Sequence, residues 1–267
     1  MSISRKFLLP FSPIYGLVTM LRNLGYDKGV FESRSYSIPI ICVGNLSVGG
    51  TGKSPMVEYL INHLKNDYRL ATLSRGYGRT TKGFHLLKNN DLAEKVGDEP
   101  LQFNTKFPEV IVAVDENRQR GIDKLIEIEN PDVIILDDAF QHRKVKAGLN
   151  ILLTTYGDLY TDDILLPAGN LREPVSGAGR AEIVVVTKCP QELSKQEQEG
   201  ISNKLNLSPE QKLFFGYIEY SSHLKNDKGS ISLGSIIGKQ ILLITGIAND
   251  RPLLDHLKNE KLTQQKM

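Results

Sequence analysis

The segment IPIICVGNLSVGGTGKSPMVEYL (residues 38–60) joins an apolar run to a glycine-rich turn and then to a stretch with helical character. A strand, a glycine-rich loop and a helix N-terminus in this order form the phosphate-binding loop of nucleoside-triphosphate enzymes. Glycines let backbone N–H groups point at phosphate oxygens, and the helix end adds a partial positive charge. The chain is therefore predicted to bind ATP through Val48, Gly49, Gly50, Thr51, Gly52, Lys53, Ser54 and Pro55.

Two side chains of this loop are predicted to act on the nucleotide. Lys53 is expected to reach the β- and γ-phosphates, and the Ser54 hydroxyl is expected to ligate Mg²⁺. The strict pattern G-x-x-x-x-G-K-[ST] has glycine where this chain has Ser47. A glycine-rich turn with a chance Gly-Lys-Ser is the alternative, and the strand and helix on either side argue against it.

Length and composition are those of an ordinary globular protein. The 267 residues are 40% hydrophobic and 24% charged, which suits one large α/β domain or one and a half. A net charge of +2 gives no reason to expect nucleic acid as a partner. Cys42 and Cys189 are far apart without metal-ligand spacing, so we expect buried free thiols in a reducing compartment. No apolar run is long enough to span a bilayer.

Residues 1–35 differ from the rest of the chain. Apolar residues recur at helical spacing from Ile14 to Leu24, and Phe7 and Phe11 precede them in an apolar cluster. Basic residues outnumber acidic ones in this segment. The pattern predicts an amphipathic helix that lies on a membrane surface. A helix packed on its own domain is the alternative.

Beyond residue 35 strands alternate with helices, which predicts an α/β, P-loop NTPase-like fold with a mostly parallel sheet and helices on both faces. We expect strands near residues 38–43, 69–74, 84–87, 110–114, 133–137, 150–154, 182–187 and 240–245. We expect helices after the phosphate loop to about residue 65, from residue 97, from a cap at Asp115 to about residue 129, over 191–205, and from about Pro252. The predicted organisation is a kinase core over 36–220 and a C-terminal portion over 221–267, which begins with a polar, loop-like connection at 221–230.

Several loops follow these strands at their carboxyl ends, where ligands bind in such sheets. Residues 74–79, 137–143 and 246–250 should therefore converge with the phosphate loop on one cleft. Asp137 ends an aliphatic run in the Walker-B manner and is predicted to hold Mg²⁺. The arginines of residues 75–79 suit an anion site or a surface turn, and Asp98 and Glu99 suit a site or a helix cap. Arg172 and Glu173 suit a site or a solvated loop.

Six ordered motifs together resemble the tetraacyldisaccharide 4'-kinase family of lipid A biosynthesis. They are GNLSVGGTGKSP (44–55), SRGYGR (74–79), VGDEP (96–100), LDDAFQHR (136–143), LPAGNLREP (166–174) and TGIAND (245–250). The resemblance covers nearly the whole chain and includes the N-terminal segment, which is similar to the family's membrane-associating helix. It implies transfer of the γ-phosphate of ATP to the 4'-hydroxyl of an acylated glucosamine disaccharide 1-phosphate. It also implies a location at the cytoplasmic face of the bacterial inner membrane.

The resemblance also implies roles for individual residues. Asp98 matches the family's general base, and Lys53 keeps its phosphate-binding role. Asp137, Asp138 and Glu173 match acidic positions around Mg²⁺ and the γ-phosphate, with Asp138 also counted as catalytic. The positions expected near the acceptor are Arg75, Tyr77, Gln141, His142 and Arg172.

The chain departs from the family pattern in two places. Ala139 stands where the family often has glycine, a change that matters only if this residue needs a positive φ. The Asp-His-His motif that follows residues 245–250 in the family does not occur, and His256 does not fit it. Since the histidine of that motif pairs with the base, we expect this chain to bind ATP and to turn over slowly or not at all.

Two other functions fit parts of the sequence. One is a P-loop ATPase that acts as a nucleotide-dependent switch. Residues 187–190 resemble a guanine-reading N-K-x-D without its aspartate, which argues against a GTPase. The other is a soluble kinase for a small hydroxylated acceptor, with residues 1–35 packed on the domain. The sequence does not determine the oligomeric state.

Overall fold

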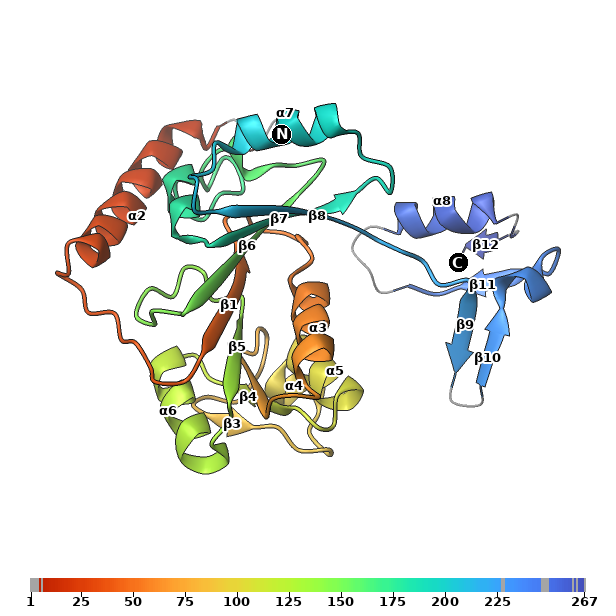
Figure 1. Cartoon of the computed structure of the whole chain (residues 1–267), viewed down its shortest axis with the longest axis horizontal. Coiled ribbons are helices and arrows are strands. Elements are labelled where there is room, and N and C mark those ends of the chain that lie inside the picture. The colour runs from red at the N-terminus through yellow and green to blue at the C-terminus, as the bar shows by residue number, and fades with distance from the viewer. Residues whose placement is uncertain are drawn as a thin grey trace. The chain divides into compact units, whose positions relative to one another are not determined.

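The computed structural model describes residues 5, 7–226, 229–245, 250–260, 262 and the backbone of 264–266. The chain divides into two compact units, Met1–Tyr217 and Ile218–Met267. The first unit holds a sheet of eight strands, and the second holds two sheets of two strands each (Figure 1).

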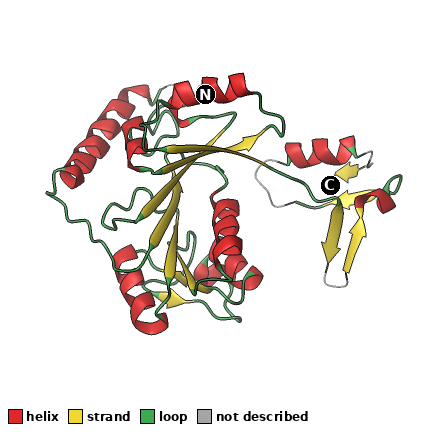
Figure 2. Cartoon of the chain, viewed as in Figure 1, coloured by secondary structure: helices red, strands yellow, loops and turns green. Residues whose placement is uncertain are grey.

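The first unit is an α/β structure. Its strands are β1 (Ile40–Asn45), β2 (Leu70–Ser74), β3 (His85–Leu86), β4 (Ile111–Val114), β5 (Val133–Asp137), β6 (Leu149–Thr155), β7 (Ile183–Cys189) and β8 (Lys212–Tyr217). Its helices are η1 (Leu9–Phe11), α2 (Ser12–Asp27), α3 (Lys53–Leu64), α4 (Ala93–Val96), α5 (Asp98–Lys106), α6 (Arg118–Glu129), η2 (Tyr160–Asp162), η3 (Val175–Arg180) and α7 (Lys195–Leu205). The strand order is β3-β4-β2-β5-β1-β6-β7-β8, and all neighbours are parallel except the short β3 beside β4. Figure 2 distinguishes the helices and strands by colour. The mostly parallel sheet is confirmed.

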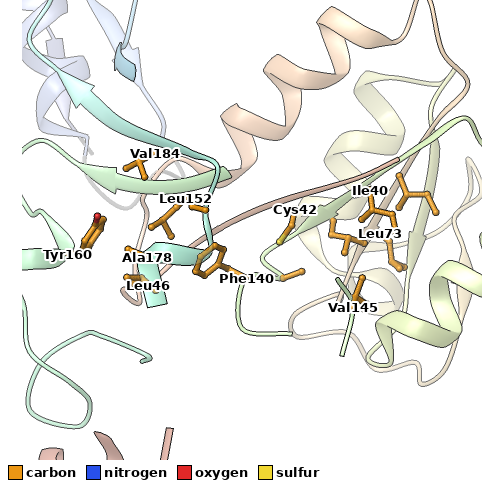
Figure 3. Close-up of a cluster of buried hydrophobic side chains, with 14 of the residues drawn as sticks. Ile40, Cys42, Leu46, Leu73, Phe140, Val145, Leu152, Tyr160, Ala178 and Val184 are labelled. Carbon is orange, nitrogen blue, oxygen red and sulfur yellow. The ribbon is translucent and has the colours of Figure 1, made fainter. Parts of the chain in front are cut away.

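Two hydrophobic layers hold the sheet between helices. Along β5, Ile134 and Leu136 join one buried cluster, whereas Val133 and Ile135 join the other, because successive side chains point to opposite faces. Helices α6 and α7 cover the first cluster, and α3 and α5 cover the second. Figure 3 shows part of the first layer. Each fully buried aliphatic side chain contributes about 1.5–3 kcal/mol, so both faces stabilise the central strands.

The strand order places the phosphate loop at the centre of the sheet. β1 lies between β5 and β6. Strands β2 to β5 are added on one side of β1, and the direction then reverses so that β6 to β8 are added on the other side. Such a reversal opens a crevice at the carboxyl ends of the strands. The loops after β1, β2 and β5 therefore begin at the same edge.

The N-terminal helix α2 keeps its apolar face outside. Its buried residues are the small Ser12, Gly16 and Thr19, and Ser12 Oγ donates to the Leu165 carbonyl at 2.9 Å. Ile14 and Val18 are each 61% exposed. The apolar residues at helical spacing thus do not pack on the domain. None of the helices described combines the length and hydrophobicity of a bilayer-spanning segment.

Two local predictions are wrong, and one strand was not predicted. Asn117, and not Asp115, caps α6, accepting a hydrogen bond from Arg120 N; Asp115 is buried and ion-paired with Arg120. Strand β8 was not predicted, because its apolar residues sit in a polar stretch. The polar connection at 221–230 contains β9 (His223–Asn226) and β10 (Gly229–Ser232), which pair antiparallel. Their exposed residues form no apolar pattern.

The second unit also contains η4 (Leu233–Ile236), β11 (Ile241–Leu243), α8 (Arg251–Asn259) and β12 (Gln264–Lys266). β11 confirms a strand within 240–245, although it pairs with β12 and not with the large sheet. α8 confirms the helix expected from about Pro252. A small cluster of Leu233, Leu257 and Leu262 forms its core. Residues 246–249, expected at the cleft, lie outside the described residues.

Candidate active site

The phosphate loop leaves β1 and enters α3 through a left-handed glycine. Gly52 precedes α3 with φ at +89°, a conformation that disfavours a side chain. Lys53 is the first residue of α3, and Pro55 lies in its first turn, where a missing N–H costs little. The order strand, loop and helix is the one predicted from the sequence.

Lys53 meets an acidic residue from the neighbouring strand. Its Nζ lies 3.8 Å from Asp138 Oδ1 and 3.5 Å from Asn45 Oδ1. Asp138 follows the last residue of β5 with φ at +49°. Ala139 is not among the described residues with positive φ, so replacement of the family's glycine carries no backbone strain.

Arg172 contacts the same carboxylate as Lys53. Its Nη1 and Nη2 donate to Asp138 at 3.2 and 2.9 Å, and Nη2 also donates to Asn45 Oδ1. The backbone brings Arg172 there, because its N–H donates to the Leu46 carbonyl at 2.8 Å. Residues far apart in sequence thus surround one carboxylate with two cations, and Arg172 belongs to the site and not to a solvated loop.

The two aspartates at the end of β5 have opposite electrostatic environments. Asp137 is 1% exposed, and burial, with the charges of Glu99 and Asp138, raises its pKa to about 7. Burial also raises the pKa of Asp138, but the hydrogen bonds of Arg172 and the charge of Lys53 outweigh it, so that pKa lies below its usual value. The Asp137 Oδ1 atom has no partner among the described residues.

The first turn of α5 brings a second carboxylate to the phosphate loop. Glu99 Oε1 accepts a hydrogen bond from Ser54 Oγ at 2.6 Å. Asp98, one residue earlier, is exposed and lies in a separate shallow depression with Leu101 and Gln102. The structure therefore brings Glu99 to Ser54 and does not place Asp98 among the residues that line the cleft.

These oxygens fit a magnesium ion that also binds phosphate. Ser54, Asp137 and Asp138 offer hydroxyl and carboxylate oxygens beside Lys53, and the orphaned buried Oδ1 of Asp137 lacks a cation or donor. No group of three acidic, cysteine or histidine ligands occurs in the part of the chain that the structure describes. Magnesium does not need one, since it usually keeps several waters and takes one or two carboxylates plus substrate phosphates.

Glu173 has contacts other than those expected of a metal ligand. It is fully buried, and its Oε1 accepts from Arg180 at 2.8 Å and from Gln141 at 3.0 Å. Its Oε2 accepts from Asn23 of α2 at 2.8 Å. Both oxygens therefore accept hydrogen bonds from protein donors, one of which is Gln141 of the cleft lining.

A cleft of about 560 Å³ extends from Asp137 and Asp138 along α2. All five residues expected near the acceptor line it: Arg75, Tyr77, Gln141, His142 and Arg172. Burial lowers the pKa of His142 to about 4, and the charges of Arg118 and Arg75 act in the same direction, so this imidazole is neutral at pH 7. Arg79, by contrast, is a structural residue that pairs with Glu116 at 2.5 Å.

Sequence reasoning missed several residues around the loop and cleft. Thr187 Oγ1 donates to the Thr51 carbonyl at 2.8 Å, and Lys188 Nζ donates to the Gly50 carbonyl at 2.5 Å. Tyr15, Arg22 and Tyr26 of α2 line the cleft. Their spacing of seven and four residues puts them on one helix face, a signal that the apolar pattern of the same helix obscured.

Comparison with known proteins identifies the family. The family described as tetraacyldisaccharide-1-P 4'-kinase matches residues 4–267. The tetraacyldisaccharide 4'-kinase of Flavobacterium johnsoniae is 55% identical over 261 residues, covering 97% of this chain and 77% of that protein. The Bacteroides thetaiotaomicron protein of the same name is 48% identical over 265 residues, covering 95% of this chain and 70% of that protein.

A solved structure supports the same relationship. LpxK from Aquifex aeolicus, crystallised in complex with ATP, superposes with a TM-score of 0.81 at 34% identity. The match covers 99% of this chain and 81% of that one. The P-loop architecture, the converging motifs and these relatives agree. The chain therefore belongs to the tetraacyldisaccharide 4'-kinase family.

Proposed function

We propose that this protein transfers the γ-phosphoryl group of ATP to the 4'-hydroxyl of a tetraacylated glucosamine disaccharide 1-phosphate, giving the 1,4'-bisphosphate. One observation carries the proposal: Lys53 of the phosphate loop, Asp138 of β5 and Arg172 meet at the end of a cleft large enough for a sugar. Family membership supplies the identity of the acceptor. The cleft supplies a place for it beside the nucleotide site.

The donor half positions charge around the transferring group. In phosphoryl transfer the protein mainly orients the reactants and stabilises charge. Lys53 and the backbone amides of residues 48–54 bind the phosphates. Ser54, Asp137 and Asp138 would hold Mg²⁺, which would supply positive charge to the phosphate oxygens. Arg172 fixes the orientation of Asp138 through two hydrogen bonds.

Asp98 is the proposed base that takes the proton from the acceptor hydroxyl. The family resemblance alone supports this role, because Asp98 is exposed at the start of α5 and lies outside the residues that line the cleft. Glu99 is the adjacent competitor, because it already accepts the Ser54 hydroxyl. Asp98→Ala is expected to remove most activity at an unchanged ATP affinity. Glu99→Ala should instead raise the Mg²⁺ concentration needed for activity, because the Ser54 hydroxyl loses its hydrogen-bond acceptor.

The membrane is the proposed source of the acceptor. η1 and α2 expose Leu9, Phe11, Ile14, Leu17 and Leu21 on one side, and an amphipathic helix of this kind binds at a lipid interface. The opposite side of α2 lines the cleft. The proposed location is the cytoplasmic face of the inner membrane, where a lipid acceptor and ATP meet.

A transfer assay with labelled ATP and a tetraacyl disaccharide 1-phosphate tests the function. The parent chain should form labelled bisphosphate, and the Lys53→Ala variant should form none. Acceptor-independent hydrolysis with no lipid product would instead support the nucleotide-dependent switch. A chain extended through an Asp-His-His segment, assayed in parallel, measures what that motif contributes.

Flotation with anionic vesicles separates the membrane enzyme from a soluble small-molecule kinase. Ile14→Ser/Leu17→Ser/Leu21→Ser should abolish flotation while ATP binding persists, because all three side chains are exposed. A parent chain that does not float would argue for the soluble alternative. Flotation that persists in the variant would show that vesicle binding does not depend on the exposed face of α2.

A further inference from the structure

The end of β7 contacts the phosphate loop through two consecutive side chains. Thr187 Oγ1 lies 2.8 Å from the Thr51 carbonyl oxygen, and Lys188 Nζ lies 2.5 Å from the carbonyl oxygen of Gly50. The Thr187 hydroxyl also lies 3.1 Å from the Thr154 carbonyl oxygen of β6. A hydroxyl has one proton to donate, and the shorter distance favours the loop. The phosphate loop, which follows β1, is thus tied to a strand that is separated from β1 by β6.

A β-bulge explains how neighbouring residues of one strand reach the same target. Val184 and Val186 lie in one buried cluster and Val185 in the other, as the alternation of side chains along a strand requires. Continued alternation would put Cys189 with Val185, yet Cys189 lies in the cluster of Val184 and Val186. The register with β8 shifts between Val186 and Cys189, which is the mark of an extra residue on β7. The side chains of residues 187 and 188 therefore share the sheet face that α3 covers.

The backbone of Lys188 has an unusual conformation at this bulge. Its φ is +57°, in the left-handed region that residues other than glycine rarely adopt. The residue is exposed, so burial does not hold its side chain in place, whereas the hydrogen bond to Gly50 does. Bulges near active sites re-aim side chains, and strained backbone collects at functional sites. The conformation of Lys188 is therefore explained by its contact with the phosphate loop.

The two hydrogen bonds fix the orientation of two peptide groups. In a trans peptide the C=O and the following N–H point in opposite directions. A Thr51 carbonyl held by Thr187 turns the Gly52 N–H away from β7, and the held Gly50 carbonyl does the same for the Thr51 N–H. The Thr51 N–H donates to the Gly49 carbonyl at 3.1 Å, whereas the Gly52 N–H donates to no oxygen in the described part of the chain. Such N–H groups of a phosphate loop bind phosphate oxygens.

We propose that Thr187 and Lys188 are positioning residues for ATP, because their bulge holds the phosphate-binding N–H groups in orientation before the nucleotide arrives. The inference rests on the proposed function only through ATP as the phosphate donor. Gly49, Gly50 and Gly52 give the loop backbone wide conformational freedom. A binding group that is ordered in advance loses less entropy when its ligand binds. Loss of either hydrogen bond should therefore weaken ATP binding and leave the stability of the fold nearly unchanged.

The test measures ATP binding to the intact chain by titration calorimetry, without an acceptor. Thr187→Val removes the hydroxyl and keeps the branched side chain, Thr187→Ser keeps the hydroxyl, and Lys188→Met removes the ammonium group. Thr155→Val is the first matched control, because the Thr155 hydroxyl lies 3.2 Å from the Asp158 carbonyl oxygen, outside the phosphate loop. Lys195→Met is the second, because Lys195 is an exposed lysine at the start of α7.

Thr187→Val and Lys188→Met should each raise the Kd for ATP about tenfold, the effect of one lost hydrogen bond. Thr187→Ser and both controls should bind ATP as the parent does. The Tm of the nucleotide-free variants should stay within about 2 °C of the parent. Amide hydrogen exchange of residues 46–54 should become faster in Thr187→Val and Lys188→Met, whereas exchange in β6 and β7 should not change.

Four outcomes would overturn the proposal. They are an unchanged Kd in both variants, a loss in Thr187→Ser equal to that in Thr187→Val, an equal loss in Thr155→Val, and a lowered Tm with faster exchange throughout β6 and β7. A loss confined to Lys188→Met would instead assign a direct phosphate contact to Lys188 and would also overturn it. A parent chain that binds ATP but transfers nothing to the lipid acceptor would refute the proposed function alone, because the positioning role is measured without an acceptor.

Discussion

The buried ion pair between Arg180 and Glu173 allows a quantitative test of the cleft wall. Glu173 is fully buried, whereas Arg180 is 22% exposed, and their closest atoms are 2.8 Å apart. Arg180→Met keeps an unbranched apolar side chain but removes the positive charge, together with the guanidinium that lies 4.6 Å from the Phe140 ring centroid. The Glu173 carboxylate then keeps hydrogen bonds from Gln141 and Asn23 without a cation.

Removing one partner of a buried pair costs about 3–5 kcal/mol because the other charge stays buried. The lower end, about 3 kcal/mol, applies here, since two neutral donors remain and water reaches the arginine. In a domain of this size 1 kcal/mol corresponds to about 2–4 °C in Tm. Arg180→Met is therefore expected to lower the Tm of the first unit by about 6–12 °C.

Differential scanning calorimetry on the intact chain measures the loss, and Arg180→Met/Glu173→Gln provides the matched comparison. The neutral amide needs no cation, so the double variant should recover at least half of the lost Tm. A single variant within about 2 °C of the parent, or a double variant no more stable than the single, would refute the ion-pair role. Glu173→Gln should also leave the Mg²⁺ requirement unchanged, because both carboxylate oxygens contact protein donors. A raised Mg²⁺ requirement would restore Glu173 as a metal ligand.

Three further predictions concern other parts of the first unit. Gly52→Ala should abolish ATP binding measured by calorimetry while the fold persists, because its φ of +89° strains any side chain; retained affinity would contradict this. Arg172→Lys should lower kcat at least about tenfold in the transfer assay, since lysine does not form the two-bond fork to Asp138, and a kcat near that of the parent would show the fork is dispensable. The pKa of Glu116 is lowered from an ordinary 4.5 to about 2. Its carboxylate accepts hydrogen bonds from its own backbone, from Gly83 and from Arg120, and the charge of Arg79 acts in the same direction. The ionised Glu116 therefore stabilises the fold above pH 4.5, and this contribution is lost as the pH falls toward 2. Glu116→Gln should make the free energy of unfolding, measured by urea titration, less dependent on pH between 4.5 and 2. An unchanged pH dependence in this range would contradict the role of Glu116.

Many features of this protein follow from the sequence alone, because they depend on residues close together in the chain. The alternation of apolar runs and helices predicted the parallel sheet, and glycines before Lys53 predicted the phosphate loop. Asp137 was recognisable because an aliphatic strand ends on it. These signals are local, since strand periodicity, helix starts and loop conformation depend on neighbouring residues. The short exposed strands β9 and β10 lack such a signal, and they were predicted as a loop.

The tertiary structure decided which side chains face the cleft. Asp98 and Glu99 are adjacent carboxylates in the first turn of α5, and the sequence alone does not show which one faces the phosphate loop. Successive residues of a helix point in directions about 100° apart, and Glu99 is the one that contacts Ser54. Glu173 belonged to a family motif, yet packing paired it with Arg180. Arg22 had no motif, and only the folding of α2 along the sheet edge placed it in the cleft. The sequence determined the phosphate loop and the family, whereas long-range packing determined how charge is distributed around the cleft. Its contacts join residues of different elements, from Asp138 and Arg172, 34 positions apart, to Tyr15 and Arg172, 157 positions apart.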